Sequence, residues 1–299
     1  MDLWRQGLRF NVRVEGPERG PVVLFLHGFP QDTAAWDRVW PPLARTGFRV
    51  FIPEQRGCSA QARPPGRRAY RMSELIDDVL ALADQIGADQ FHLVGHDLGG
   101  AVAWRIGAWH PRRVLSLTVI STPHPNALCR AVLTHVWQAR QSAYLAFFQL
   151  PWLPERLLLA DGCRRFRERL ISSGLDESHA LAYTERLGDL AAMRGALGRY
   201  RGMPLSRSRP SRGRRDQEHG QAIGRPGSLR SGRIPVPTLY VWGSEDAFLC
   251  RRAALDSGRW VSGRCQVVEL PGSSHWIPEQ DPELLVELIS RHLADSPAS

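Results

Sequence analysis

The stretch that most constrains this chain is residues 91–100, with the sequence FHLVGHDLGG. Its largely apolar start predicts a buried strand, and Gly95-x-Asp97-x-Gly99 then has the spacing of a nucleophile elbow, a sharp strand-to-helix turn that lifts one side chain above a sheet. Glycine is needed on both sides because the turn strains its central residue and brings the backbone close to a neighbouring strand and helix. The raised side chain here is the carboxylate of Asp97.

A carboxylate at the turn narrows the chemistry. Its attack on an ester or amide would give a labile mixed anhydride, so a carboxylate nucleophile suits displacement at a saturated carbon. Epoxides and alkyl halides are therefore the candidate substrates. A helix is expected directly after the turn, as far as His110-Pro111, and its N-terminal amides would help to keep Asp97 ionised. The alternative is that Asp97 only caps this helix.

Composition places the chain among globular proteins. It has 299 residues, of which 43% are hydrophobic, and this length fits one large domain with an inserted subdomain. No apolar run follows Met1, so neither a secretory signal nor a membrane span is expected, and the predicted location is cytoplasmic. The cysteines lack metal-ligand spacing and are predicted to be free thiols. They are Cys58, Cys129, Cys163, Cys250 and Cys265.

The net charge of +9 does not predict a nucleic-acid partner, because it is concentrated in one stretch. Residues 201–233 hold nine arginines against Asp216 and Glu218. The chain has no lysine, which indicates a coding bias toward arginine rather than a phosphate-binding face.

Strand and helix patterns alternate in the first part of the chain. Helices are expected at about 32–46 and 73–86, between apolar runs that predict strands, and this order predicts a right-handed, doubly wound parallel sheet. The runs lie at 22–26, 49–53, 91–94 and 114–121, followed much later by 238–242 and 265–270. A closing helix is expected from Asp281-Pro282.

Helical periodicity without strand signals occupies residues 126 to about 200. The simplest account is a helical cap inserted after a core strand, over the carboxyl edge where open α/β sheets bind ligands. Residues 202–233 are rich in Ser, Arg, Gly and Pro, which predicts a flexible linker. The predicted domains are a first core part at 1–125, the cap at 126–201, the linker at 202–233 and a second core part at 234–299.

Two later strands are each followed by a residue that can complete a catalytic set. Asp246 follows strand 238–242, and His275 follows strand 265–270. The order Asp97, Asp246, His275 is the nucleophile, acid, base order of the α/β-hydrolase architecture.

The loop His27-Gly28-Phe29-Pro30 follows strand 22–26. A loop in this place is expected to supply one backbone N–H of an oxyanion hole, from Phe29, and the residue after the nucleophile, Leu98, supplies the other. His27 is predicted to be structural and to orient this loop through hydrogen bonds.

Over nearly its whole length the sequence resembles the epoxide hydrolase family of the α/β-hydrolase superfamily. The motifs that carry the resemblance are His27-Gly28-Phe29-Pro30, Gln55-Arg56-Gly57, Gly95-His96-Asp97-x-Gly99-Gly100, Gly243-x-x-Asp246 and Ser274-His275-Trp276. The resemblance implies two cap tyrosines that donate hydrogen bonds to the epoxide oxygen. Tyr144, shortly before Phe148-Gln149-Leu150-Pro151, and Tyr200, followed by Arg201, match those positions, whereas Tyr183 matches neither. The alternative for each tyrosine is ordinary packing in the cap.

Some positions depart from the family pattern. Leu98 stands where many members have tryptophan, which counts against a haloalkane dehalogenase, in which that tryptophan commonly contacts the halide. Residues 100–103 contain no arginine of the kind that holds a carboxylate in fluoroacetate dehalogenases. Glu54 and Cys58 stand where many members have an aspartate and an aromatic residue.

The resemblance implies hydrolysis of a small, apolar epoxide to a vicinal diol. Asp97 would form a covalent ester while Tyr144 and Tyr200 stabilise the opening oxygen, and His275, oriented by Asp246, would activate water to cleave the ester. No metal or organic cofactor is implied. A haloalkane or haloacid dehalogenase with the same nucleophile and a non-catalytic small-molecule receptor on the same fold remain as alternatives. A homodimer is also left open.

Overall fold

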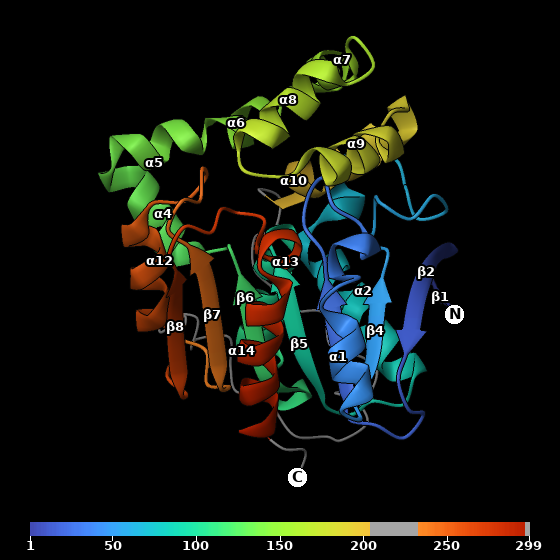
Figure 1. The fold of residues 1–299 in the computed structure, drawn as a ribbon. Helices are drawn as coiled ribbons and strands as arrows, with labels where there is room; N and C mark the ends of the chain where they lie inside the picture. Colours follow the sequence, from blue (N-terminus) through green and yellow to red (C-terminus); the bar gives the residue numbers. More distant parts are fainter. Residues whose placement is uncertain (204–232, 297–299) are drawn as a thin grey trace.

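A mostly parallel, eight-stranded sheet forms the centre of the molecule (Figure 1). The computed structural model describes residues 1–203 and 233–296, and its strand order is β1-β2-β4-β3-β5-β6-β7-β8. The β1–β2 and β2–β4 pairs are antiparallel, and all later pairs are parallel. The strands are β1 (Asp2–Arg5), β2 (Leu8–Glu15), β3 (Val22–Leu26), β4 (Arg49–Pro53), β5 (Phe91–His96), β6 (Val114–Ile120), β7 (Thr238–Gly243) and β8 (Cys265–Leu270). The predicted α/β fold class is confirmed.

Helices cover both faces of the sheet, and the side chains of β3 show why its sequence is apolar throughout. Leu24 and Leu26 belong to the core cluster shared with α2 (Met72–Gln85) and α3 (Leu98–Trp109). Val23 and Phe25 belong to the opposite cluster, shared with α1 (Trp40–Arg45) and α14 (Pro282–Ala294). Successive strand side chains point to opposite faces, so a strand buried on both sides needs apolar residues at every position. The short helix α12 (Arg251–Ser257) contributes Ala254 to the first cluster.

The helix expected over residues 32–46 is divided in two. The structure has a 3-10 turn, η1 (Thr33–Trp36), whose first turn is capped by the Asp32 carboxylate, followed by α1. Pro41 and Pro42 occupy the first turn of α1, because proline lacks the N–H that would continue a preceding helix. The division does not disturb the core, since Trp36 and Leu43 are both fully buried.

A series of helices follows β6, and Figure 1 shows α6 to α10 above one end of the sheet. An apolar cluster joins this layer to three residues that follow core strands, Phe29, Leu98 and Trp276, so the helices cover the carboxyl ends of the strands. The first helix of this series, α4 (Pro125–Thr134), lies beside the core and contacts α12. The series is α4 (Pro125–Thr134), α5 (Val136–Gln141), α6 (Ala143–Phe147), α7 (Leu153–Leu159), α8 (Arg164–Ser172), α9 (Glu177–Arg186) and α10 (Leu190–Gly202).

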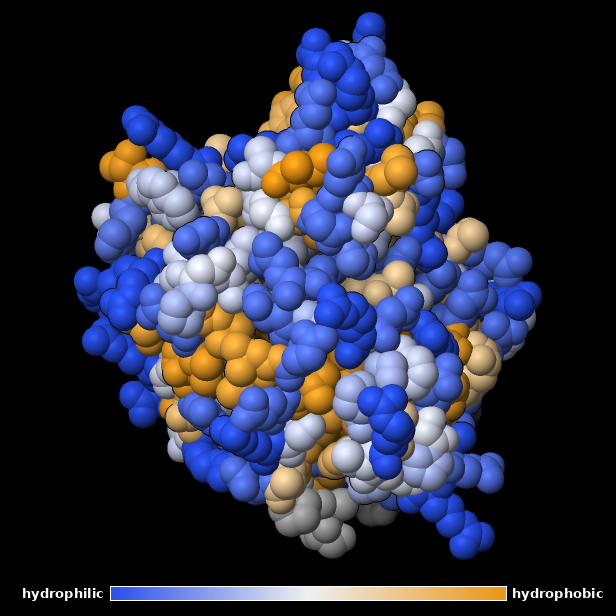
Figure 2. Space-filling model, viewed as in Figure 1, coloured by the Kyte–Doolittle hydropathy of each residue, from blue (hydrophilic) through white to orange (hydrophobic). Residues whose placement is uncertain are grey.

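The domain boundaries expected from the sequence stay a prediction. Of the predicted linker at 202–233, residues 204–232 lie outside the described residues. Within the described part of the chain, no helix has the length and apolar composition needed to cross a membrane. The face shown in Figure 2 is mostly hydrophilic, with an apolar area over β7 and β8, where the edge strand β8 is only half-buried.

Candidate active site

The elbow forms as the sequence predicts, between β5 and α3. Asp97 has φ 48° and ψ −118°, a strained conformation for a residue with a side chain. A Cβ at Gly99 would collide with the carbonyl oxygen of Leu26, and one at Gly95 would collide with the backbone of Gly99. The Thr122 hydroxyl donates a hydrogen bond of 2.8 Å to the carbonyl oxygen of Asp97, which holds the turn from the β6 side.

The Asp97 carboxylate lies against the two predicted oxyanion-hole amides. The N–H of Phe29 donates to Oδ1 at 3.2 Å, and the neighbouring N–H of Leu98 also favours the charged carboxylate. Burial raises the pKa of Asp97 above its ordinary value, although the charge of His275 and these two amides oppose the shift. The structure therefore brings the Phe29 and Leu98 amides to the Asp97 carboxylate, and their role as an oxyanion hole stays a prediction.

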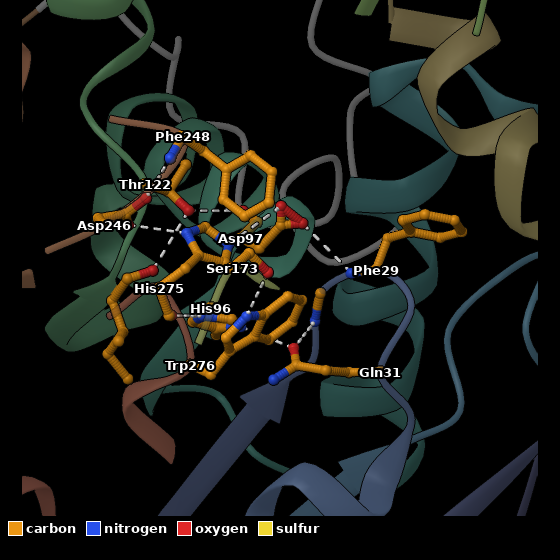
Figure 3. Close-up of polar contacts among 12 residues, drawn as sticks. Phe29, Gln31, His96, Asp97, Thr122, Ser173, Asp246, Phe248, His275 and Trp276 are labelled. Carbon is orange, nitrogen blue, oxygen red and sulfur yellow. Dashed lines mark hydrogen bonds and ion pairs between the residues drawn. The ribbon is translucent and has the colours of Figure 1, made fainter. Parts of the chain in front are cut away.

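His275 and Asp246 come together beside Asp97 (Figure 3). Nδ1 of His275 donates to Oδ2 of Asp246 at 2.8 Å, while the other Asp246 oxygen accepts from the N–H of Phe248 at 2.8 Å. Nε2 of His275 then faces Oδ2 of Asp97 at 4.0 Å, too far for a direct hydrogen bond. Burial alone would lower the pKa of His275, yet the Asp246 and Asp97 carboxylates raise it above its ordinary value.

A buried hydrogen-bond network behind these residues was missed by the sequence reasoning. His96 lies between Oε1 of Gln31, at 2.6 Å, and the carbonyl oxygen of His275, at 2.9 Å. Gln31 also accepts from the N–H of Gly28 and donates to Glu279 at 2.7 Å. The network therefore connects the oxyanion loop, the elbow and the histidine loop.

Tyr183, on α9, ends this network rather than facing Asp97. Its hydroxyl donates to Oε1 of Glu279 at 2.8 Å. Burial raises the pKa of Glu279 to about 7. The sequence signals that could have pointed to this network are positions along the chain. Gln31 directly follows Pro30, and Glu279 lies shortly after His275.

The two family-matched tyrosines lie together near Asp97. The rings of Tyr144, on α6, and Tyr200, on α10, are perpendicular, with centroids 6.1 Å apart. Burial is the main cause of the raised pKa of both phenols, and the charge of Asp97 is the second cause. Neither hydroxyl has a hydrogen-bond partner in residues 1–203 or 233–296. Both are thus protonated donors with no protein acceptor in that part of the chain.

Aromatic rings surround the site, and the sequence reasoning assigned none of these rings to its walls. Phe248 contacts His275, with ring centroids 4.8 Å apart, and Phe148 contacts Tyr200 at 5.0 Å. Phe29 stacks on Phe166 at 5.8 Å. Such walls suit an apolar ligand with few polar groups. No cluster of three or more His, Cys, Asp or Glu residues that could hold a metal exists among the residues the structure describes.

The segment between α8 and α9 bonds directly to residues that follow His275. The indole N–H of Trp276 donates to the Ser173 hydroxyl at 3.0 Å, and the Gln280 amide donates to the carbonyl oxygen of Gly174 at 2.8 Å. Together with the Tyr183 bond to Glu279, these contacts fix the histidine loop from above.

Comparison with known proteins agrees with this geometry. Residues 21–282 match the family model described as alpha/beta hydrolase fold. The chain is 30% identical over 285 residues to Epoxide hydrolase 4 of Homo sapiens, covering 95% of this chain and 75% of the human protein. The chain belongs to the epoxide hydrolase family of α/β hydrolases.

Other members of this superfamily match over almost their full length. AB hydrolase superfamily protein YfhM of Bacillus subtilis is 30% identical over 296 residues, covering 96% of this chain and 95% of that protein. A solved structure described as one of several novel epoxide hydrolases in metagenomes from hot environments superposes with a TM-score of 0.80 at 25% identity, covering 98% of this chain and 97% of that one. This epoxide hydrolase family member is therefore a hydrolase, as the sequence predicts.

Proposed function

We propose that this protein hydrolyses an epoxide to a vicinal diol through a covalent ester on Asp97. The observation that carries the proposal is a carboxylate on the elbow beside two tyrosine hydroxyls that have no protein acceptor in the described residues. An epoxide needs both groups, one to attack carbon and the other to donate to the ring oxygen. The relatives named epoxide hydrolases support the same reaction.

The first step uses Oδ2 of Asp97, because Oδ1 is held by the Phe29 N–H. Oδ2 attacks a ring carbon, the ring C–O bond breaks, and its electron pair moves to the ring oxygen. Tyr144 or Tyr200 gives that oxygen its phenolic proton, which leaves a hydroxyalkyl ester and a tyrosinate. The Asp97 charge raises both phenol pKa values in the resting site, and this charge disappears as the neutral ester forms. Proton donation thus becomes easier as the bond to carbon forms.

The second step uses His275 as a base. Its Nε2 takes a proton from water, and the resulting hydroxide adds to Cγ of the Asp97 ester. Negative charge develops on Oδ1, where the N–H groups of Phe29 and Leu98 stabilise it. Collapse breaks the bond from Cγ to the alkyl oxygen, which takes the proton of the added hydroxyl and leaves as the diol. The proton on His275 returns through solvent to the tyrosinate, so one water and one epoxide give one diol.

Asp246 orients the base in this account. Its bond to Nδ1 fixes the tautomer that presents Nε2 to water, and its charge favours the imidazolium that forms during the second step. We also propose that residues 126–201 act as the cap, that the substrate is a small apolar epoxide, and that the enzyme works in the cytoplasm without a cofactor.

A diol-forming screen tests the proposal. The purified protein is incubated with terminal, styrene-type and fatty-acid epoxides, and with the matching chloroalkanes. The proposal predicts a vicinal diol from at least one epoxide class and no halide release. Halide release without diol formation would show that the protein is a dehalogenase and not an epoxide hydrolase. Stoichiometric binding without turnover would indicate a receptor.

A further inference from the structure

Arg199, on α10, carries a buried positive charge that has no ionic partner among the residues the structure describes. The residue is 1% exposed, and no carboxylate in the described residues lies within 4.0 Å of its guanidinium. Its Nε is buried without a hydrogen-bond partner in the same part of the chain. An unpaired buried cation costs several kcal/mol. Arg56, equally buried, shows the usual solution, with two bonds of 2.7 Å to Asp78.

The guanidinium donates to the loop that forms the oxyanion hole. Nη1 lies 3.3 Å from the carbonyl oxygen of Gly28, and Nη2 lies 3.3 Å from that of His27 and 3.0 Å from Oε1 of Gln55. The Gly28 carbonyl belongs to the same peptide group as the N–H of Phe29, which donates to Asp97. A cation on one end of a peptide group fixes its plane and strengthens the donor at the other end. Arg199 therefore reaches Asp97 through one peptide.

Asp97 is the acid on which this charge acts. Arg199 opposes the rise that burial causes in the pKa of Asp97, together with His275 and the amides of Phe29 and Leu98. Cys58, whose sulfur lies 3.7 Å from Nη1, does not supply a counter-charge, because burial raises the pKa of its thiol. The other groups near Asp97 are the phenols of Tyr144 and Tyr200, whose pKa values are also raised.

We propose that Arg199 is a positioning residue that aims and polarises the Phe29 N–H through the Gly28 carbonyl and so stabilises negative charge on Oδ1 of Asp97. The inference rests on the proposed function. The stabilisation that Arg199 provides is smallest in the ester, where Asp97 is neutral, and it returns when the tetrahedral oxyanion forms. Arg199 thus lowers the barrier to ester hydrolysis more than the barrier to ester formation.

This asymmetry separates the proposal from a merely structural role. Arg199 precedes Tyr200, so a substitution that only loosened α10 would displace a proton donor of the first step and slow ester formation. A weakened oxyanion hole slows the second step instead. Intact-protein mass spectrometry during single turnover measures both rates.

The variants are Arg199→Met and Arg199→Lys, with Arg194→Met as the matched control on the exposed side of the same helix. Loss of one oxyanion donor costs about 100- to 1,000-fold, and because Arg199→Met keeps the donor but weakens it, we expect ester hydrolysis to slow by about tenfold or more. Ester formation should stay within about threefold, so the ester accumulates. Arg199→Lys keeps the charge but not the two-carbonyl contact, and its hydrolysis rate should fall between those of Arg199→Met and the wild type.

Slowed ester formation with unchanged hydrolysis would overturn the inference, as would wild-type hydrolysis in every variant that folds. If Arg199→Met does not fold, the ratio of ester hydrolysis to ester formation in Arg199→Lys tests the inference instead. A second readout does not depend on turnover: ¹³C NMR of labelled aspartate follows the titration of Asp97 in the free protein. Arg199→Met should raise the pKa of Asp97, and Arg194→Met should not. An unchanged pKa contradicts the inference, while a raised pKa in a protein that forms no ester supports it and places the failure in the proposed function.

Discussion

The cap tyrosines give the most quantitative prediction, which concerns Tyr144→Phe, Tyr200→Phe and the double variant. Each phenol is expected to donate to an oxygen that becomes charged only as the epoxide opens. Hydrogen bonds to charged groups contribute about 1.5–3 kcal/mol, so each single variant should form the ester about ten- to a hundred-fold more slowly. The double variant should be nearly inactive on epoxides, because no proton donor remains for the ring oxygen.

The structure predicts that folding survives these changes. Neither hydroxyl has a hydrogen-bond partner in the described residues, so its removal leaves no buried group unsatisfied there. Phenylalanine keeps the ring contacts, including those of both tyrosines with Phe148, at 5.5 and 5.0 Å. The free energy of unfolding should therefore change by less than about 1 kcal/mol.

Tyr183→Phe is the matched control. Its hydroxyl bonds the buried Glu279 carboxylate, so its loss should lower the free energy of unfolding by about 1–3 kcal/mol. Because it does not face Asp97, ester formation should slow far less than in the other two variants. The assay is the single-turnover rate of ester formation on an epoxide found in the diol screen, beside urea unfolding. A double variant that forms the ester at the wild-type rate would show that Tyr144 and Tyr200 are packing residues and would refute the reasoning.

Three further predictions concern the base and its supporting network. His275→Gln should still form the ester but not hydrolyse it, so mass spectrometry should find the adduct on Asp97; an active variant without an adduct removes His275 as the base. Ester hydrolysis needs neutral His275, so its rate should rise as pH increases through the pKa of His275. Asp246 raises that pKa, and Asp246→Asn should move this rise to lower pH, whereas an unmoved pH profile would contradict the role of Asp246. Glu279 has a folded-state pKa of about 7, above its ordinary value, so the folded state binds the extra proton and stability falls as pH rises from about 4.5 to 7, by up to about 3 kcal/mol. Glu279→Gln should remove this loss, and its free energy of unfolding relative to wild type should increase between pH 5 and pH 8; a constant difference would contradict the assignment.

The predicted site residues that the structure brings together are those marked by local backbone demands or by chain order. The glycines around Asp97 follow from collisions within one turn, and Phe29, Asp246 and His275 each follow a strand whose apolar run is visible in the sequence. These features depend on neighbours a few residues away, so pattern and spacing are enough to find them.

The missed features depend on contacts between distant segments. Gln31 bonds Glu279 across 248 residues, and Arg199 bonds the carbonyl of Gly28 across 171, and no local pattern reports such pairs. The two catalytic tyrosine candidates came from the family resemblance, since helical periodicity alone does not distinguish them from Tyr183. The division of the helix at 32–46 could have been predicted, because Pro41-Pro42 marks the first turn of a new helix.

The most direct test of the covalent mechanism follows the source of the oxygen in the diol. One turnover with enzyme in excess is run in water enriched in ¹⁸O, and both the diol and the peptide that contains Asp97 are analysed by mass spectrometry. Because water attacks Cγ of the ester, the account predicts an unlabelled diol from this first turnover and one ¹⁸O in the carboxylate of Asp97. Label in the diol together with an unlabelled Asp97 would show that water attacks the epoxide directly and would contradict the ester intermediate.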